Sequence, residues 1–461
     1  MPLFSRSVSS PLPLREQIRL DHIPDWANLW GQFATQGPAV LLESAGSLEE
    51  AARWIILAGK PEIEFWGLNG MGWLKDGAGL RNTPEDLWEF LDEIAIANTS
   101  FEPLPRGLSR AWFGLIGYDY GKHHQIHPPK IDFIKRRSIP DYYFFKPAFV
   151  LVFDRQTREC YSYGTDIPPS LTDDQFCLDP FRVHSIKSLM TQKEYENMVR
   201  QGQGYIVKGD IYQSNLSQAF QAQWEGGSGN LYKILREVNP GPFMGIFQGH
   251  DFTVVSSSPE RLIAGKGEWL ETRPIAGTRP RGKTSVDDLQ MKWELETNPK
   301  EQAEHLMLVD LARNDLGRVS NFGTVEVCRF AGIESYSRVH HLVSTVQSVR
   351  KQSTGFSGVL KSLFPGGTIT GCPKIRCMEI IEELENEPRG FYTGSMGYVA
   401  PGPCFDFNIL IRSLTLTPDG SLTFHAGAGI VADSDPQKEY METLYKAEAL
   451  AQSLGTSFLN S

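Results

Sequence analysis

The chain has 461 residues, of which 41% are hydrophobic and 22% are charged, and its formal net charge is −10 at pH 7. This is the composition of a globular protein, and the acidic balance argues against general binding to nucleic acid. We find no run of 18 apolar residues for a membrane span and no signal-peptide core in MPLFSRSVSSPLPLREQ. The six cysteines form no C-x-x-C pair, so we expect buried thiols and a cytoplasmic location.

The N-terminal part of the chain is rich in strand patterns. Residues 1–18 are rich in Ser, Pro and Arg, and we expect a loose arm there. Residues 38–45, 111–121 and 147–154 are apolar runs, rich in β-branched or aromatic residues and typical of strands. A long polar stretch follows, and we place a boundary at its end. The boundary gives an N-terminal region (residues 1–187), a second region (residues 188–455) and a tail (residues 456–461).

The second region opens on a helix signal. Thr191 and Glu194 have the spacing of a capping box, and the following residues, EYENMVRQGQGYIVKG, have a helical pattern. Further along, strand patterns such as DFTVVSSS and SMGYVA alternate with helical stretches. We therefore expect an α+β fold with many antiparallel strands.

The octapeptide GTRPRGKT (residues 277–284) matches the phosphate-loop pattern G-x-x-x-x-G-K-T. A working phosphate loop follows a buried strand, but the preceding EWLETRPIA is polar and interrupted by Pro274. Pro280, inside the loop, has no N–H group to offer a phosphate. We therefore expect a basic turn here.

Two stretches far apart in the chain carry the same pair of glutamates. Glu301 and Glu304 in one, and Glu439 and Glu442 in the other, are spaced to lie on one face of a helix. If the helices face each other, four carboxylates converge, and such oxygen ligands suit a hard cation such as Mg²⁺. Each pair alone is also common on a solvated helix, and Lys446 is spaced to form an ordinary stabilising pair with Glu442.

A series of ordered motifs resembles the chorismate-utilising enzymes, in particular component I of aminodeoxychorismate synthase or of anthranilate synthase. They are SSPER, ETRPIAGTRPRG, EHLMLVDLARNDLGRV, HHLVS, FPGGTITGCPKIRCMEIIEELE, YTGSMGY, IRS and AGAGIVADSDPQKEYMETLYKA. The resemblance covers nearly all of residues 190–455, and LLES and NPGPFM extend it weakly to the N-terminal region. It implies a large chorismate-binding fold, with antiparallel β-sheets packed between outer helices.

The resemblance also implies roles for individual residues. Glu260 of SSPER is expected to protonate the leaving C4 hydroxyl of chorismate. Mg²⁺ is expected on Glu304 and Glu442, while Glu301 and Glu439 hold its waters. His341 would pack beside the ring, with Thr278 among the catalytic residues. The expected substrate contacts are Thr368, Tyr392, Arg412, Gly427, Ala428, Gly429 and Lys446. A non-catalytic protein for acidic ligands would explain the cationic residues but not the second glutamate pair.

Two positions bear on the reaction. Family members that add water have a basic lysine where this chain has Gln213, and glutamine cannot take a proton at pH 7. The resemblance therefore implies ammonia as the nucleophile. Ala276 stands where many aminodeoxychorismate synthases have a lysine and anthranilate synthases have alanine. FPGGTITG and FDFNILIRS resemble the aminodeoxychorismate enzymes more, so we expect 4-amino-4-deoxychorismate for p-aminobenzoate and folate synthesis, with anthranilate for tryptophan synthesis as the alternative.

Partners are implied by the same resemblance. The chain has no recognisable glutaminase cysteine motif, so a separate glutamine amidotransferase subunit is expected to supply ammonia. LLES and NPGPFM resemble the pocket where tryptophan binds in relatives, although the two stretches also read as a strand end and a turn. The possible tryptophan site comprises Leu42, Glu43, Ser44, Asn239, Pro242, Phe243 and Met244.

Overall fold

The computed structural model describes residues 11–20, 23–44, 53–84, 86–96, 101–125, 139–165, 178–336 and 338–459. The elements of the N-terminal region are β1 (Leu14–Arg19), α1 (Trp26–Ala34), β2 (Ala39–Glu43), β3 (Trp54–Leu68), β4 (Met71–Asp76), β5 (Gly79–Thr83), α2 (Leu87–Ile96), η2 (Arg106–Arg110), β6 (Trp112–Ile116), α3 (Tyr118–Gln125), β7 (Tyr142–Asp154), β8 (Glu159–Gly164) and β9 (Phe181–Ser188).

The second region is longer and has more helix. Its elements are α4 (Gln192–Val207), β10 (Gln213–Gly226), α5 (Ser228–Val238), β11 (Phe243–Gln248), β12 (Thr253–Ser258), β13 (Arg261–Lys266), β14 (Trp269–Arg273), β15 (Ile275–Pro280), α6 (Ser285–Thr297), α7 (Pro299–Val319), β16 (Glu326–Ser335), β17 (Val339–Val349), α8 (Phe356–Leu363), η3 (Gly367–Ile369), β18 (Gly371–Cys372), α9 (Lys374–Leu384), β19 (Ser395–Ala400), β20 (Cys404–Asn408), β21 (Ser413–Leu416), β22 (Ser421–Ile430) and α10 (Pro436–Ser453).

The strands pair antiparallel and form a sheet that branches at the paired strands β3 and β7. One branch runs β3–β2–β11–β12–β21–β22–β10. The other runs β7–β6–β19–β20–β13–β14–β17. Val40 and Phe247 of the first branch share a buried apolar cluster with Phe113 and Met396 of the second. The two branches therefore pack on each other.

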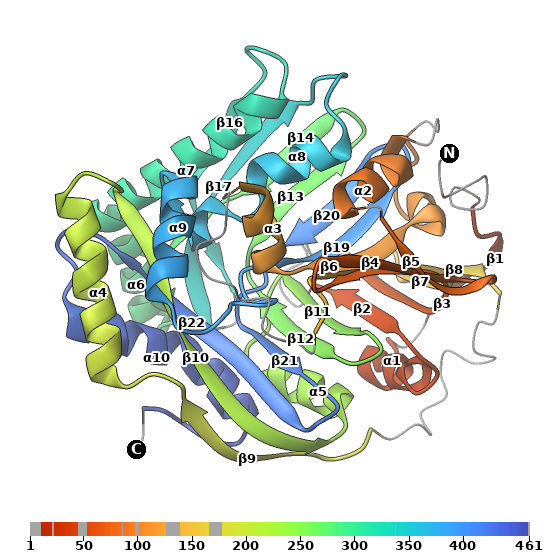
Figure 1. Cartoon of the computed structure of the whole chain (residues 1–461), viewed down its shortest axis with the longest axis horizontal. Helices are drawn as coiled ribbons and strands as arrows, with labels where there is room; N and C mark the ends of the chain where they lie inside the picture. Colours follow the sequence, from red (N-terminus) through yellow and green to blue (C-terminus); the bar gives the residue numbers. More distant parts are fainter. Residues whose placement is uncertain are drawn as a thin grey trace.

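Helices cover the outer faces of both branches. Leu29 of α1, Leu231 of α5 and Leu450 of α10 pack against strands of the first branch. Helices α2, α7, α8 and α9 contribute to the cluster that includes Ile263 and Phe407 of the second branch. In Figure 1 the helices α4, α6, α7, α9 and α10 lie on one side and the N-terminal strands on the other. The α+β class, with antiparallel sheets between outer helices, is confirmed.

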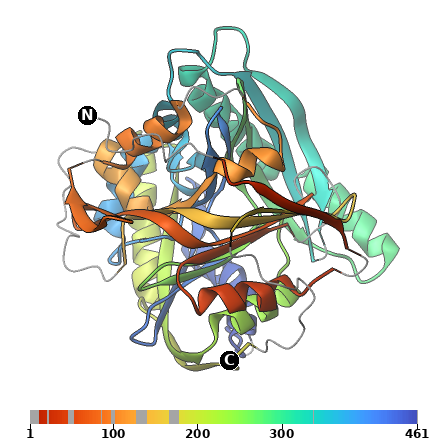
Figure 2. The same ribbon diagram turned by 90° about the vertical axis from the view of Figure 1, so that its right-hand side faces the viewer.

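The two regions share the sheet. β2 pairs with β11, and β6 pairs with β19, so strands from both sides of residue 187 are hydrogen-bonded to each other. Residue 187 itself lies within β9, which pairs with β10. Figure 2 shows the N-terminal strands, red to yellow-orange, crossing the face nearest the viewer above α1. The boundary at residue 187 stays a proposal about organisation along the chain.

Several local predictions can be compared with the structure. Thr191 and Glu194 form the predicted capping box at the start of α4. Pro274 separates β14 from β15, and both short strands pair with β17. The predicted loose arm was wrong for Leu14–Arg19, which pairs with β8 because Ile18 packs on the first-branch core. Residues 1–10 lie outside the described part.

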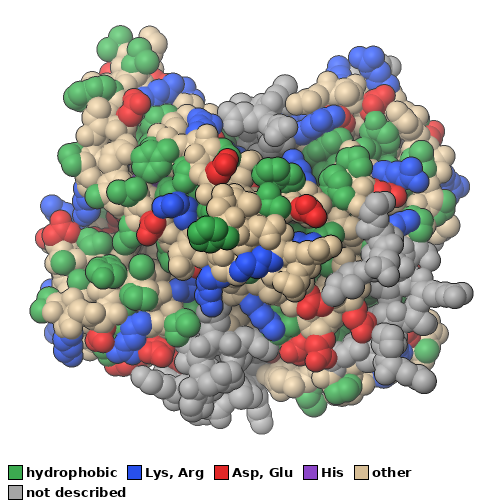
Figure 3. Space-filling model, turned by 90° about the horizontal axis from the view of Figure 1, so that it is seen from above, with side chains coloured by type: hydrophobic (Ala, Val, Ile, Leu, Met, Phe, Trp, Pro, Cys, Tyr) green, Lys and Arg blue, Asp and Glu red, His purple; other side chains and the backbone are tan. Residues whose placement is uncertain are grey.

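The described cysteines agree only in part with the expectation that the thiols are buried. Cys160, Cys377 and Cys404 are buried free thiols, whereas Cys328 is exposed on β16. Among the described helices, none has the length and apolar character needed to cross a bilayer. On the face seen from above, cationic, anionic and hydrophobic side chains are interspersed (Figure 3).

Candidate active site

The two glutamate pairs lie at the starts of capped helices. Asn298 caps α7 by accepting hydrogen bonds from the backbone of Lys300 and Glu301. Asp435 caps α10 in the same way. Glu301/Glu304 and Glu439/Glu442 therefore occupy the first two turns, where the positive end of the helix dipole favours carboxylates. We call these four residues the glutamate cluster.

The electrostatics place both pairs in one region. Burial raises the pKa of Glu304; the charges of Glu301 and Glu442 add to this rise, while Gln213 and Lys446 oppose it. Burial also raises the pKa of Glu439, and the charge of Glu442 contributes. A carboxylate on α10 thus acts on one on α7. The two helices bring their glutamates together instead of directing them to opposite surfaces.

Two members of the cluster have cationic partners. Lys446 lies 2.8 Å from Glu442 and lowers its pKa, and Arg279 lies 3.0 Å from Glu301. In the part of the chain that the structure describes, no three His, Cys, Asp or Glu side chains are gathered closely enough to hold an ion. The cluster nevertheless has the donor chemistry for a hard divalent cation: carboxylate oxygens only, with two of the four glutamates at raised pKa. A cation there would offset the repulsion among them.

Beside the glutamate cluster, β10 and β22 form a floor of amides and glycines. Gln213 Nε2 donates to Glu304 Oε1 at 3.0 Å. A Cβ on Gly429 would collide with that amide, and one on Gly427 would lie 2.5 Å from Asn215 Oδ1. A side chain at either position would therefore displace one of the two amides. We call Gln213, Asn215, Gly427 and Gly429 the site floor.

Other predicted substrate contacts border this floor. Lys446 Nζ donates to the carbonyl oxygen of Gly427 at 3.0 Å, and Tyr392 stacks on His425 with centroids 5.0 Å apart. A Cβ on Gly427 would lie 3.0 Å from the Tyr392 hydroxyl. The side chain of Ala428 is different: it is buried in the core on the opposite face of β22, so only its backbone can belong to the site.

Glu260 is the acid with the largest rise in pKa near these elements. It follows β12, where Ser258 Oγ accepts from its N–H at 3.2 Å and Ile409 N–H donates to its carbonyl at 3.0 Å. Burial raises the pKa of Glu260 to about 8, although the hydroxyl of Thr368 and the backbone of Ile275 oppose the rise. Both Glu260 and Thr368 line a small cavity of ≈30 Å³. At pH 7 the carboxyl is therefore mostly protonated and can donate.

His341 stands opposite Thr278 in the β15–β17 ladder. Its Nδ1 lies 3.0 Å from Thr278 Oγ1 and 3.4 Å from the carbonyl oxygen of Gly277, a contact that favours a hydrogen on Nδ1. Nε2 is buried and has no hydrogen-bond partner. Burial and the charge of Arg412 lower the His341 pKa to about 3, so the ring is neutral. Ala276 is buried on β15 one residue before Gly277.

Arg412 has the features of a binding cation. Its backbone adopts a φ of +52°, a conformation that costs energy for a non-glycine residue and is often found at functional sites. The guanidinium forms no ion pair with any carboxylate of the described residues, and burial lowers its pKa to about 10. An arginine held in this way is ready to pair with a substrate carboxylate.

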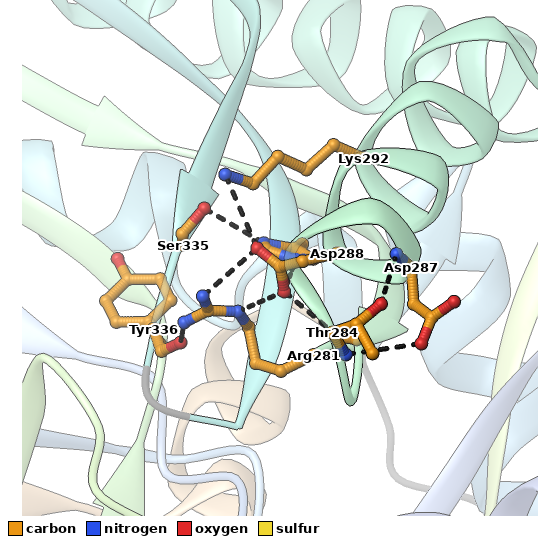
Figure 4. A network of polar contacts seen from close by, with 9 residues as sticks. Arg281, Thr284, Asp287, Asp288, Lys292, Ser335 and Tyr336 are labelled. Atoms are coloured by element: carbon orange, nitrogen blue, oxygen red, sulfur yellow. Dashed lines mark hydrogen bonds and ion pairs between the residues drawn. The ribbon is translucent and has the colours of Figure 1, made fainter.

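The octapeptide GTRPRGKT ends in a structural turn. Arg281 Nε donates to Asp288 Oδ1 at 2.6 Å, and the Gly282 N–H, which a phosphate would need, donates to the same carboxylate at 2.9 Å. Thr284 caps α6 in a box with Asp287. Figure 4 shows these side chains pointing toward one another between α6 and β16. The expected turn is therefore found only at residues 281–284, and the expectation was wrong for Gly277–Pro280, which belong to β15 because they pair with β17.

The N-terminal pocket is a separate hollow of ≈270 Å³. Of the residues predicted for a tryptophan site, it is lined by Leu42, Glu43, Ser44, Pro242, Phe243 and Met244. Asn239 does not line it, because its side chain instead donates to Ser257 Oγ at 2.8 Å. Glu43 Oε2 and Ser44 Oγ are buried without hydrogen-bond partners.

Sequence reasoning missed two contributors to the site. Asn215 lies on the floor two residues after Gln213, and the alternation of a strand could have identified it. Arg389 is buried, pairs with Glu385 at 2.7 Å and donates to the backbone of Asn215 at 2.7 Å. Its guanidinium also lies over the ring of Tyr392, at 5.6 Å. No local sequence pattern predicts this contact, because Arg389 and Asn215 are far apart in the chain.

Comparison with known proteins identifies relatives over most of the chain. Residues 53–452 match the family model of chorismate binding enzymes. The chain is 40% identical over 443 residues to an anthranilate synthase component I-like protein of Synechocystis sp., covering 92% of this chain and 88% of the relative. It is 36% identical over 446 residues to aminodeoxychorismate synthase component 1 of Bacillus subtilis, covering 91% and 92%.

The fold comparison agrees. The crystal structure of anthranilate synthase component I from Streptococcus pneumoniae matches with a TM-score of 0.75 and 29% identity, over 94% of this chain and 99% of that one. The resemblance expected from the ordered motifs is confirmed by family, by relatives and by architecture. The chain belongs to the family of chorismate-binding enzymes.

Proposed function

We propose that the protein aminates chorismate with ammonia and releases 4-amino-4-deoxychorismate and water, as an aminodeoxychorismate synthase component I. The observation that carries the amination is the position of Gln213, where the side chain next to Glu304 is an amide and not a base. Ammonia is already a nucleophile and needs no base to activate it, whereas water does.

Glu260 is the proton donor in this proposal. The C4 hydroxyl leaves as water when it receives a proton, and the buried carboxyl keeps that proton up to about pH 8. The nitrogen that adds to the ring must lose a proton in turn, so the overall reaction consumes none. Arg412 and the glycine backbone of the site floor would bind the carboxylates of the substrate, with neutral His341 beside the ring.

Mg²⁺ would be held by the glutamate cluster, with Glu304 and Glu442 as direct ligands and Glu301 and Glu439 carrying waters. When bound, it would neutralise a substrate carboxylate and polarise the leaving side of the ring. The raised pKa values of Glu304 and Glu439 support this assignment: burial is the main cause of both rises, and the charge of Glu442 adds to each.

The product is assigned from FPGGTITG and FDFNILIRS, which resemble the aminodeoxychorismate enzymes. One observation favours anthranilate instead: Ala276, on β15 beside Gly277, offers no amine to attack the ring. The relatives bear names of both kinds. Anthranilate is therefore the second candidate.

The ammonia would come from a glutamine amidotransferase subunit, which the component names of the relatives suggest.

We also propose that the N-terminal pocket binds tryptophan. The unpartnered Glu43 Oε2 and Ser44 Oγ could accept from its ammonium group, and the apolar walls suit an indole. Ser44→Ala should weaken tryptophan binding by calorimetry roughly tenfold, the loss of a hydrogen bond to a charged group, and leave chorismate turnover unchanged.

The proposed function is tested with chorismate, ammonium and Mg²⁺, and with products separated by chromatography. A product that becomes p-aminobenzoate only after a lyase is added supports 4-amino-4-deoxychorismate. Anthranilate appearing without the lyase supports the second candidate. Isochorismate as the main product would show that water, not ammonia, is the nucleophile and would overturn the proposal.

A further inference from the structure

The site floor contains two amide oxygens that accept no hydrogen bond from any described residue. Gln213 Oε1 and Asn215 Oδ1 are both buried and without a hydrogen-bond partner among the described residues. A buried polar atom without a partner costs free energy, so native proteins retain it only for a reason. Two such atoms two residues apart on one strand point to an absent ligand.

The two amides lie on the same face of β10. Side chains two residues apart on a strand share a face, with Cα atoms about 7 Å apart, so both can reach one small molecule. The glycines opposite keep this space open: Gly429 lies against the Gln213 amide and Gly427 against Asn215 Oδ1. Any larger residue on β22 would fill it.

The orientation of the amides indicates a ligand that donates. Gln213 Nε2 is held by the carboxylate of Glu304 at 3.0 Å, which directs the amide oxygen away from that carboxylate. The backbone of Asn215 is fixed from two sides, because its N–H donates to Thr370 at 2.9 Å and its carbonyl accepts from Arg389 at 2.7 Å. The Gln213 acceptor is therefore positioned by a side-chain hydrogen bond, and the backbone that carries the Asn215 acceptor is held in place.

The chemistry of these acceptors suits ammonia. Ammonia has three N–H donors and one lone pair, and the lone pair must stay free to attack the ring. Neutral amide oxygens accept N–H donors without favouring protonation, whereas a carboxylate would stabilise ammonium, which has no free lone pair. The Gln213 amide thus bonds to Glu304 and offers the ligand a neutral carbonyl oxygen instead of a carboxylate.

We propose that Asn215, together with Gln213, forms the binding site for the ammonia nucleophile. The proposal rests on the proposed amination and names a positioning residue for it. Ammonia would donate an N–H group to Asn215 Oδ1, beside Gly427 and the Tyr392 hydroxyl. The two amide oxygens repel carboxylates, so the substrate carboxylates would lie against Arg412 and the backbone of Gly427 and Gly429, and not against these oxygens.

The test is steady-state kinetics with ammonium as the nitrogen source, so that no glutaminase subunit is needed. Asn215→Leu keeps the branched shape and removes the acceptor. The KM for ammonium should rise roughly five- to tenfold, as expected for one neutral hydrogen bond, while the KM for chorismate stays within about twofold. Ser214→Ala is the matched control: its hydroxyl is also buried and unpartnered but faces the other side of β10, so both KM values should be unchanged.

Asn215→Asp provides a second variant that differs by one atom and decides the question if Asn215→Leu does not fold. A carboxylate favours ammonium, so the ammonium-dependent rate should rise only at higher pH than in the wild type. An unchanged ammonium KM and pH profile, or an equal rise in both KM values, would overturn this site while leaving amination intact. A wild-type protein that consumes chorismate but makes no amine would overturn the proposed function and this site with it.

Discussion

His340 and His341 are neighbours on β17, yet their side chains enter two differently built polar clusters. His340 is satisfied at both nitrogens, by Ser335 at 2.9 Å and by Asp288 at 3.0 Å, two residues labelled in Figure 4. His341 is satisfied only at Nδ1, and its Nε2 is buried without a partner. The first cluster holds a turn in place, and the second leaves polar atoms open for a ligand. For these two histidines, the hydrogen-bond partners separate the site from the scaffold, whereas the residue type does not.

The largest effect should come from the glutamate cluster. Glu304→Gln removes a charge proposed to hold the cation, and turnover should fall by roughly 1000-fold or more. The thermal unfolding midpoint should not fall, because the variant also removes a buried like charge. Asp310→Asn, an exposed carboxylate on the same helix, is the control and should keep full activity. Full activity in Glu304→Gln would show that the glutamate cluster is not catalytic.

Glu260→Gln should be next, with a loss of about 100- to 10,000-fold in kcat, typical of a lost general acid. In the wild type, kcat should fall as the pH rises through about 8, because the donating form is then lost. The folded pKa is raised above that of the unfolded chain, so ionisation costs stability between about pH 4.5 and pH 8.

The same variant should therefore gain stability relative to the wild type, and more at pH 9 than at pH 5. Calorimetric unfolding at both pH values measures this. An equal shift at both would mean that the Glu260 carboxyl is not held protonated in the fold.

The two histidines give the most direct contrast. His341→Ala should lower kcat/KM roughly ten- to a hundredfold, because it removes a group beside the ring, with little change in stability. His340→Ala should leave kcat/KM within about threefold and lower the free energy of unfolding by about 1–3 kcal/mol, since Ser335 loses the ring nitrogen it contacts and Asp288 loses one of its several partners. Kinetics and urea unfolding distinguish the two. If both variants behaved alike, the two clusters would not differ in role.

The smallest effect is expected for Lys283→Ala. Lys283 is exposed next to a turn whose backbone is already bonded to Asp288. Chorismate turnover should be unchanged, and neither protein should hydrolyse ATP. A lysine-dependent ATPase activity would instead mean that the turn binds phosphate.

Local patterns predicted much of this molecule. The capping box at Thr191, the strand break at Pro274 and the face shared by each glutamate pair depend only on residues near in sequence. Three features depend on distant partners and could not be predicted in this way. They are the pairing of residues 14–19 with β8, the contact of Arg389 with the backbone of Asn215, and the ion pair of Glu301 with Arg279.

The position of β2 and β6 inside the sheet has a consequence for the autonomy of the catalytic part. β2 lies between β3 and β11, and β6 lies between β7 and β19. A fragment that began at residue 188 would expose the open edges of β11 and β19, which are apolar and ready to pair with another chain. Such a fragment should aggregate unless residues 1–187 are supplied in trans, so the catalytic part depends on β2 and β6 to cover its edges.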